Sequence, residues 1–152
     1  PMELDFVSLL DEAGLNPIWS SDIKKEIWRK LMVNVAINPI CAISGVRNGA
    51  LLEIPELWGE SMEAMRQAES VARASGVDMG ELDLEDYLRE VVTSTADNRV
   101  SMLQDLMAGR KTEIDVICGA IISKGEELGI PTPRNQILLA LVKGIEMSQN
   151  HD

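Results

Sequence analysis

The chain has 152 residues, a formal net charge of −11 and 45% hydrophobic residues, a composition that suits one folded domain with a substantial core. The acidic balance argues against nucleic-acid partners, because affinity for a phosphate backbone comes from lysine and arginine. The longest apolar run is short and interrupted by asparagine, so we expect no membrane partner. An anionic ligand would need a local cation to overcome the overall charge.

The numbers and positions of cysteine and histidine limit the kinds of catalytic and metal site that we expect. Cys41 and Cys118 lie far apart in apolar surroundings and form no CxxC pair, which is typical of buried thiols in a reduced, cytoplasmic protein. His151 is the only histidine and lies in a polar tail, so we expect no metal site built on histidine and no Ser/His/Asp triad. No secretory signal is visible, and the start at Pro1 ahead of Met2 predicts a piece of a longer protein.

Glycine and proline divide the sequence into helical lengths, and no apolar alternation is long enough for a strand, so we predict an all-α fold. A first helix is expected over 4–13. The next begins after a cap ending at Asp22 and carries an apolar row, which comprises Ile23, Ile27, Leu31 and Val35. Because Pro39 has no N–H to donate, we expect this helix to kink or break there.

Further helices are marked by their ends. Proline and glycine bound a helix over 55–74, and Asp83 caps the one that follows. A short helix from Ser101 stops at Gly109, and Thr112 is expected to cap a helix over 113–128. The last helix starts at 132–133 and carries an apolar side of Ile137, Leu138, Leu141, Val142 and Ile145. We therefore predict six or seven helices in one bundle-like domain over 1–152.

A polar row runs along the second predicted helix. Lys30, Asn34 and Asn38 follow one another at spacings of four, which places them on one face at about 6 Å per step. Asparagine is unfavourable inside a helix, and a buried amide costs about 1–3 kcal/mol unless it is paired. The row therefore predicts either a polar ligand or a polar network that satisfies itself within the core.

An ammonium beside two amides suits a reaction in which negative charge grows on a carbonyl oxygen. It stabilises the alkoxide and then delivers a proton, as in carbonyl reduction. The hydride would come from a nicotinamide cofactor, yet the sequence has neither GxGxxG nor a strand–turn–helix unit to hold one. From the residues alone, this chain is at most half of an oxidoreductase.

Four motifs occur in order along the chain: Lys30-x3-Asn34-x3-Asn38-Pro39, Asn48-Gly49, SMLQDLMAGRKTEID from Ser101 and GIPTPRN from Gly129. Together they resemble the C-terminal domain of ketopantoate reductase, also called 2-dehydropantoate 2-reductase. The resemblance covers essentially the whole chain and implies a helical fold like the C-terminal domains of the 6-phosphogluconate dehydrogenase group. It also implies reduction of 2-dehydropantoate to (R)-pantoate, a step of pantothenate and coenzyme A biosynthesis. NADP(H) would be held mainly by an N-terminal Rossmann domain absent from this chain.

The same resemblance implies roles for six residues. Lys30 looks like the general acid, and Asn34 and Asn38 look like groups that orient the substrate and the lysine. Asn48 and Ser101 resemble hydrogen-bond donors to the carboxylate and hydroxyl end of the substrate. Glu113 resembles the acid that helps to hold the substrate near the nicotinamide, although a carboxylate in a first helical turn is favourable without any ligand. Arg99, Arg110 and Arg134 lend positive potential without a motif that assigns them.

Two other functions remain open at this point. One is reduction of a different small 2-oxo acid, because the row recognises only the reacting carbonyl. The other is a helical dimerisation module in which the row is a buried network. We expect the 152-residue chain alone to be inactive, with its own Rossmann domain as a partner, and a homodimer is compatible with an exposed apolar face.

Overall fold

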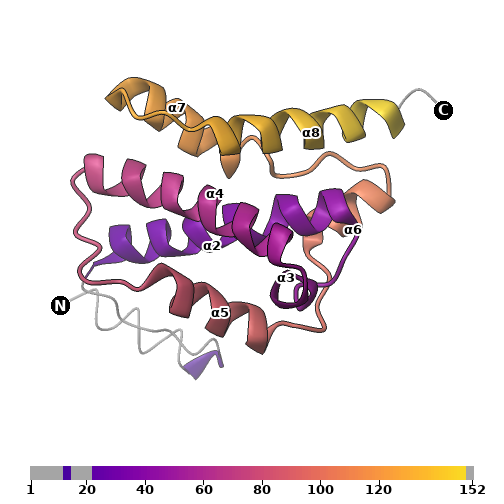
Figure 1. Cartoon of the computed structure of the whole chain (residues 1–152), viewed down its shortest axis with the longest axis horizontal. Coiled ribbons are helices and arrows are strands. Elements are labelled where there is room, and N and C mark those ends of the chain that lie inside the picture. The colour runs from indigo at the N-terminus through magenta and orange to yellow at the C-terminus, as the bar shows by residue number, and fades with distance from the viewer. Residues whose placement is uncertain (1–11, 15–21, 150–152) are drawn as a thin grey trace.

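Figure 1 shows a computed structural model of the chain, in which residues 12–14 and 22–149 are described. These residues form seven helices and no strand, which confirms the all-α prediction. The helices are α2 (Ile23–Ser44), α3 (Ala50–Glu53), α4 (Pro55–Ala74), α5 (Leu84–Ser94), α6 (Ser101–Met107), α7 (Cys118–Leu128) and α8 (Pro133–Gln149). Over the described ranges, no helix is both long and apolar enough to span a bilayer.

Helix α2 is the centre of the fold and contacts α4, α5, α6 and α8. Its start agrees with the prediction, because the Asp22 side chain accepts a hydrogen bond from the Lys25 backbone N–H at 3.1 Å. At its other end Gly45 has φ 70° and donates to the carbonyl of Cys41. In the orientation of Figure 1, α7 and α8 lie above α2 and α4, while α3 and α5 lie below them.

Pro39 does not break α2, which continues without interruption to Ser44. A proline inside a helix costs about 3 kcal/mol because it removes a hydrogen bond and crowds the preceding turn. Here the proline is itself buried, as are Ile37 and Ile40 on either side of it. Burial of this stretch against neighbouring helices offsets the local cost. Of the kink or break expected at Pro39, the break does not occur.

The apolar row of α2 is buried only in part. Ile23 and Ile27 are 66% and 59% exposed, whereas Val35 is fully buried and Leu31 is half-buried. The buried residues of α2 begin at Met32, because the first turns of the helix extend past the core. The spacing therefore predicted correctly that these residues share one face of α2, but it did not predict how much of that face is buried.

Most of the other predicted boundaries are confirmed. Helix α4 covers Pro55–Ala74 as expected, and the Asp83 side chain caps α5 by accepting from the Asp86 N–H at 2.9 Å. The helix expected over 4–13 falls outside the described residues, apart from its last two positions.

Two predictions near the C-terminus were wrong in part. The helix expected over 113–128 begins only at Cys118, and 113–117 forms a turn. On α8, Leu138 and Val142 are buried, but Ile137 and Leu141 remain 47% and 46% exposed. That exposed pair lines an apolar groove between α8 and the C-terminal end of α2.

Candidate functional site

The polar row predicted on α2 is present and open. Lys30 is exposed, and Asn34 and Asn38 are half-buried. Within the described part of the chain, none of the three makes a side-chain hydrogen bond or an ion pair. A buried network that satisfies itself is therefore not what holds these groups, and their donors and acceptors are available to a ligand.

Lys30 lines a groove of about 390 Å³ between α2 and α5. The two helices contact each other and run in the same direction in Figure 1. The other lining residues are Glu26, Arg29, Val33, Tyr87 and Val91. Burial raises the pKa of the Tyr87 hydroxyl, and the nearby Arg29 guanidinium opposes that rise, so Tyr87 stays a neutral hydroxyl at physiological pH.

Asn48 lies in the turn after α2, which is joined to the segment that follows α5. The Asn48 backbone N–H donates to the carbonyl of Asn98 at 3.0 Å, and the Gly49 N–H donates to that of Ala96 at 2.9 Å. A Cβ on Gly49 would lie 3.1 Å from the Ala96 oxygen, so the close approach favours glycine. The Asn48 amide also donates to the hydroxyl of Thr95 at 3.0 Å.

These contacts change the expected role of Asn48. Its side chain is only 6% exposed and its Nδ2 already has a partner, while its buried Oδ1 has none among the described residues. The group left to a ligand is thus an acceptor as well as one remaining N–H, where the motif alone suggested a donor. Ser101 follows Asn98 by three residues, is exposed and begins α6, so both predicted residues lie at the same end of the molecule.

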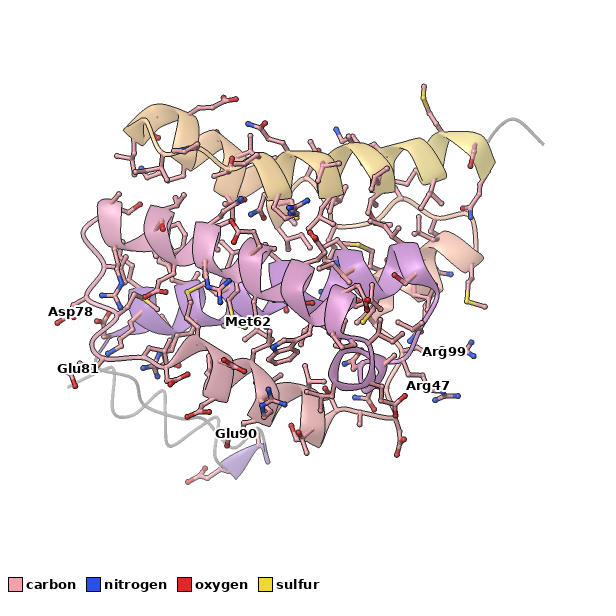
Figure 2. All side chains as sticks on the ribbon, in the orientation of Figure 1. Arg47, Met62, Asp78, Glu81, Glu90 and Arg99 are labelled. Atoms are coloured by element: carbon pink, nitrogen blue, oxygen red, sulfur yellow. The ribbon has the colours of Figure 1, made fainter. Side chains whose placement is uncertain are left out.

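Two arginines at this end were not assigned by any motif. Figure 2 shows Arg47 and Arg99 beside each other, and both line a groove of about 460 Å³ together with Gly49 and Ala96. The Arg47 guanidinium also donates to the carbonyl of Asp97. Glu53 and Asp97 line the same groove, so the two arginines balance two carboxylates there, in a chain whose net charge is −11.

The three arginines singled out in the sequence differ in their surroundings. Arg110 pairs with Asp105 at 3.0 Å, and Arg134 lies 2.7 Å from a carboxylate oxygen of Glu60. Arg99 makes no ion pair with any residue that the structure describes. Only Arg99 among them is therefore available to attract an anion.

Glu113 is exposed in the turn before α7. Across the described ranges, no hydrogen bond or ion pair joins it to the α2 row, to Asn48 or to Ser101. The residue before it is tied to α8, because Glu146 accepts hydrogen bonds from the Thr112 backbone N–H and hydroxyl. The α2 row and the Asn48 turn are therefore consecutive parts of the chain. Glu113 lies instead in the turn before α7, next to a residue that is hydrogen-bonded to α8.

Metal and redox chemistry depend on the side chains that could bind a metal ion and on the two thiols. The part of the chain that the structure describes contains no cluster of three or more His, Cys, Asp or Glu side chains that could hold a metal ion. Cys41 and Cys118 are free and buried, and burial raises the pKa of each thiol to about 12. A dinucleotide has no matching cradle either, since the described residues form no strand and the sequence has no GxGxxG.

Comparison with known sequences gives a consistent result. Residues 22–146 match the family described as ketopantoate reductase PanE/ApbA C terminal. A 2-dehydropantoate 2-reductase of Archaeoglobus fulgidus is 45% identical over 138 residues, which cover 91% of this chain and 46% of that protein. One of Vibrio cholerae is 38% identical over 145 residues, covering 95% and 49%. The chain spans about half the length of these curated relatives.

Comparison with solved structures also finds ketopantoate reductases. A PanE/ApbA family ketopantoate reductase from Ralstonia eutropha JMP134 superposes with a TM-score of 0.90 at 32% identity, covering 97% of this chain and 49% of that one. A D-mandelate dehydrogenase in complex with NADH and anilino(oxo)acetate gives 0.86 at 31% identity, covering 96% and 61%. A dimeric ketopantoate reductase of Staphylococcus aureus, at 20% identity and a TM-score of 0.80, shares the fold.

Proposed function

Because the chain belongs to the ketopantoate reductase family through its C-terminal part, we propose that it is the helical substrate-binding and catalytic domain of a 2-dehydropantoate 2-reductase. The reaction converts 2-dehydropantoate to (R)-pantoate, a step of pantothenate and coenzyme A biosynthesis. The observation that carries the proposal is the open row on α2. A lysine and two amides share one helix face without partners among the described residues, although asparagine disfavours the helix.

In this proposal Lys30 is the proton donor. Reduction adds a hydride to the carbonyl carbon, the carbonyl oxygen becomes an alkoxide, and the Lys30 ammonium gives that oxygen its proton. Asn34 and Asn38 donate hydrogen bonds that orient the oxo acid and the lysine. The product is the 2-hydroxy acid, and the lysine is left neutral until solvent protonates it again.

The other end of the substrate is assigned to the Asn48 turn. Ser101 donates to the hydroxyl or carboxylate end, and Asn48 uses its remaining N–H and its free oxygen there. Arg99 attracts the carboxylate, because it is exposed and has no ion pair among the described residues. Glu113 holds the substrate from the α8 side of the site.

The hydride has to come from NADPH bound outside the described residues, which offer no dinucleotide cradle. We assign NADPH binding to an N-terminal Rossmann domain of the intact protein. That Rossmann domain is the partner of the domain formed by residues 1–152. The isolated chain is then inactive, and the intact enzyme works in the cytoplasm, as the two free thiols of this domain suggest.

The test compares two lysines of the same helix in the intact enzyme. Lys30→Ala is expected to lower kcat with 2-dehydropantoate by about 10²–10⁴-fold, the usual contribution of a general acid. Lys24→Ala is the matched control, since Lys24 is also exposed on α2, and it should retain nearly full activity. Both variants should melt like the wild type. Equal rates for Lys30→Ala and wild type would exclude Lys30 as the proton donor.

A second substrate class has a specific observation in its favour. The likeness to D-mandelate dehydrogenase, at a TM-score of 0.86 and 31% identity, fits a reductase of a bulkier 2-oxo acid. Measuring kcat/KM with 2-dehydropantoate and with a phenyl-substituted 2-oxo acid separates the two, because the row reads only the carbonyl while the rest of the pocket sets the preference.

The dimerisation module remains the alternative from another class. It predicts that Lys30→Ala destabilises the domain by several kcal/mol, as removal of one partner from a buried charge network does. The exposure of Lys30 favours the catalytic interpretation instead. A homodimer through the groove beside Ile137 and Leu141 is compatible with either, and light scattering of the intact protein measures it.

A further inference from the structure

The turn over 113–117 is a specific structure and not a frayed helix end. The Glu113 carbonyl accepts from the N–H groups of both Val116 and Ile117, at 3.0 and 3.2 Å. Ile117 has φ −105° and ψ −84°, outside the helical region, so the chain changes direction before α7 begins. Ile114 and Ile117 are 0% and 3% exposed, and they anchor the turn in the core.

Helix α8 holds the same turn from the other side. One carboxylate oxygen of Glu146 accepts from the Thr112 backbone N–H at 2.8 Å and also from the Thr112 hydroxyl. Lys143 lies 2.8 Å from a carboxylate oxygen of Asp115. Positions 143 and 146 share one face of α8. Glu113 therefore lies between two residues, each of which is bound by α8.

Glu146 is in an unfavourable place for helix stability. It lies in the last turn of α8, where the helix dipole disfavours a carboxylate. Two hydrogen bonds to a charged acceptor compensate, because charge-assisted bonds are about twice as strong as neutral ones. Thr112, which donates both, is only 6% exposed, and Glu146 is half-buried, so the contact is partly removed from water. The Thr112–Glu146 contact joins residues 34 positions apart and holds the residue immediately before Glu113.

We propose that Glu146 is a positioning residue for Glu113. By holding the Thr112 backbone, Glu146 keeps residues 113–117 out of a regular helix and directs the Glu113 carboxylate away from the core, toward the substrate. The Lys143 contact to Asp115 supports the far side of the turn. The inference rests on the proposed function, in which Glu113 touches the substrate.

A double-mutant cycle in the intact enzyme tests this role. Glu146→Ala should lower kcat/KM for 2-dehydropantoate about 10- to 100-fold, the usual cost of a misplaced catalytic group. In a Glu113→Ala background the same change should cost less than about twofold, because no positioned carboxylate remains to be lost. Loss of stability alone would lower activity equally in both backgrounds, so the cycle separates positioning from folding.

Two further variants sharpen the test. Glu146→Gln keeps an oxygen that accepts from Thr112, so it should recover activity to within about threefold of wild type. Glu127→Ala is the matched control, because it removes an exposed carboxylate that pairs with Lys124 on α7, away from the turn. If Glu146→Ala does not fold, Thr112→Val replaces it in the cycle and removes only the hydroxyl donor.

The outcomes are distinguishable. If Glu113→Ala keeps wild-type kcat/KM, the role of Glu113 in the proposed function is wrong and the positioning role of Glu146 falls with it. If Glu113→Ala loses activity while Glu146→Ala does not, only the positioning role is overturned. Equal losses from Glu146→Ala in both backgrounds also overturn it. A loss confined to the background that retains Glu113, restored by Glu146→Gln, supports it.

Discussion

The α2 row and the turn that carries Glu113 reach their positions in opposite ways. Lys30, Asn34 and Asn38 are placed by the repeat of one helix, and their side chains make no hydrogen bond or ion pair among the described residues. Glu113 is placed by contacts of its neighbours to α8, from residues more than 25 positions later in the chain. The first arrangement is local, whereas the second combines local hydrogen bonds within the turn with tertiary contacts to α8.

This difference has consequences for stability as well as for geometry. A helix whose centre is buried on several sides opens only when the domain unfolds, whereas a turn with many exposed positions can open by itself. We therefore expect changes near α7 and α8 to act on the turn, and changes in the α2 row to leave the fold intact.

The largest expected effect is at the junction of α7 and α8. A Cβ on Gly125 would lie 2.8 Å from the Ile130 carbonyl oxygen and 2.9 Å from the Thr132 methyl carbon. Gly125→Ala should therefore lower the free energy of unfolding by about 1–3 kcal/mol, measured by urea denaturation. Gly144→Ala is the control, since its Cβ meets nothing within 4 Å and should add up to about 1 kcal/mol. If Gly125→Ala left the free energy of unfolding unchanged, the close packing between α7 and α8 at this position would be contradicted.

The two free cysteines report on the two regions separately. Cys41 is buried in α2 and Cys118 directly follows the turn, and burial raises the pKa of each thiol to about 12. Both should resist alkylation in the native state, because the thiolate is the reactive form. We expect Cys118 to be labelled about tenfold faster than Cys41, a difference of about 1.4 kcal/mol in opening free energy. Mass spectrometry of quenched samples measures both rates, and equal rates would mean that the turn opens only with the whole domain.

Removing the amides of the row should stabilise the domain slightly. The Asn34 and Asn38 side chains make no hydrogen bonds to described residues, and alanine has a helix propensity up to about 0.7 kcal/mol better than asparagine. The double variant Asn34→Ala/Asn38→Ala is expected to melt at or above the wild-type temperature while the intact enzyme loses activity. A loss of more than about 1 kcal/mol would instead indicate that the amides belong to a buried network.

The smallest expected effect concerns the ion pair beside the turn. A hydrogen bond from Lys143 holds the pKa of the exposed Asp115 carboxyl below its ordinary value. A lowered folded-state pKa stabilises above the unfolded-state pKa of about 3.9 and loses that contribution as the pH falls through the folded value. Lys143→Ala should therefore shift the urea midpoint slightly at neutral pH and not at all in strong acid. A difference that grows on acidification would reverse this assignment.

The helix ends were predictable because they depend on neighbouring residues. Asp22 and Asp83 accept from N–H groups three residues later, and Pro55 begins α4 where its missing N–H costs nothing. The α2 row was predictable for the same reason, because spacing alone puts its members on one face. Family motifs then supplied Asn48, Ser101 and Glu113, whose roles no local pattern specifies.

What was not predictable depends on distant packing. Pro39 remains inside α2 because buried neighbours hold the helix together, which no local rule contains. A turn replaces the expected helix before α7, where Thr112 is hydrogen-bonded to Glu146, 34 positions later in the chain. Ile23 and Ile27 belong to an apolar row and yet are exposed, since spacing gives a direction and not the extent of the core.

Helix α2 presents its polar row and its buried side from adjacent positions, such as Asn34 and Val35. Interiors are close-packed, so exchanging a core side chain of α2 for a slightly larger or smaller one moves the helix by a fraction of an ångström. Such a shift carries the proposed carbonyl-binding groups with it, and catalysis is sensitive to displacements of that size. Under the proposed function, substitutions that no ligand ever touches therefore retune which oxo acids are accepted.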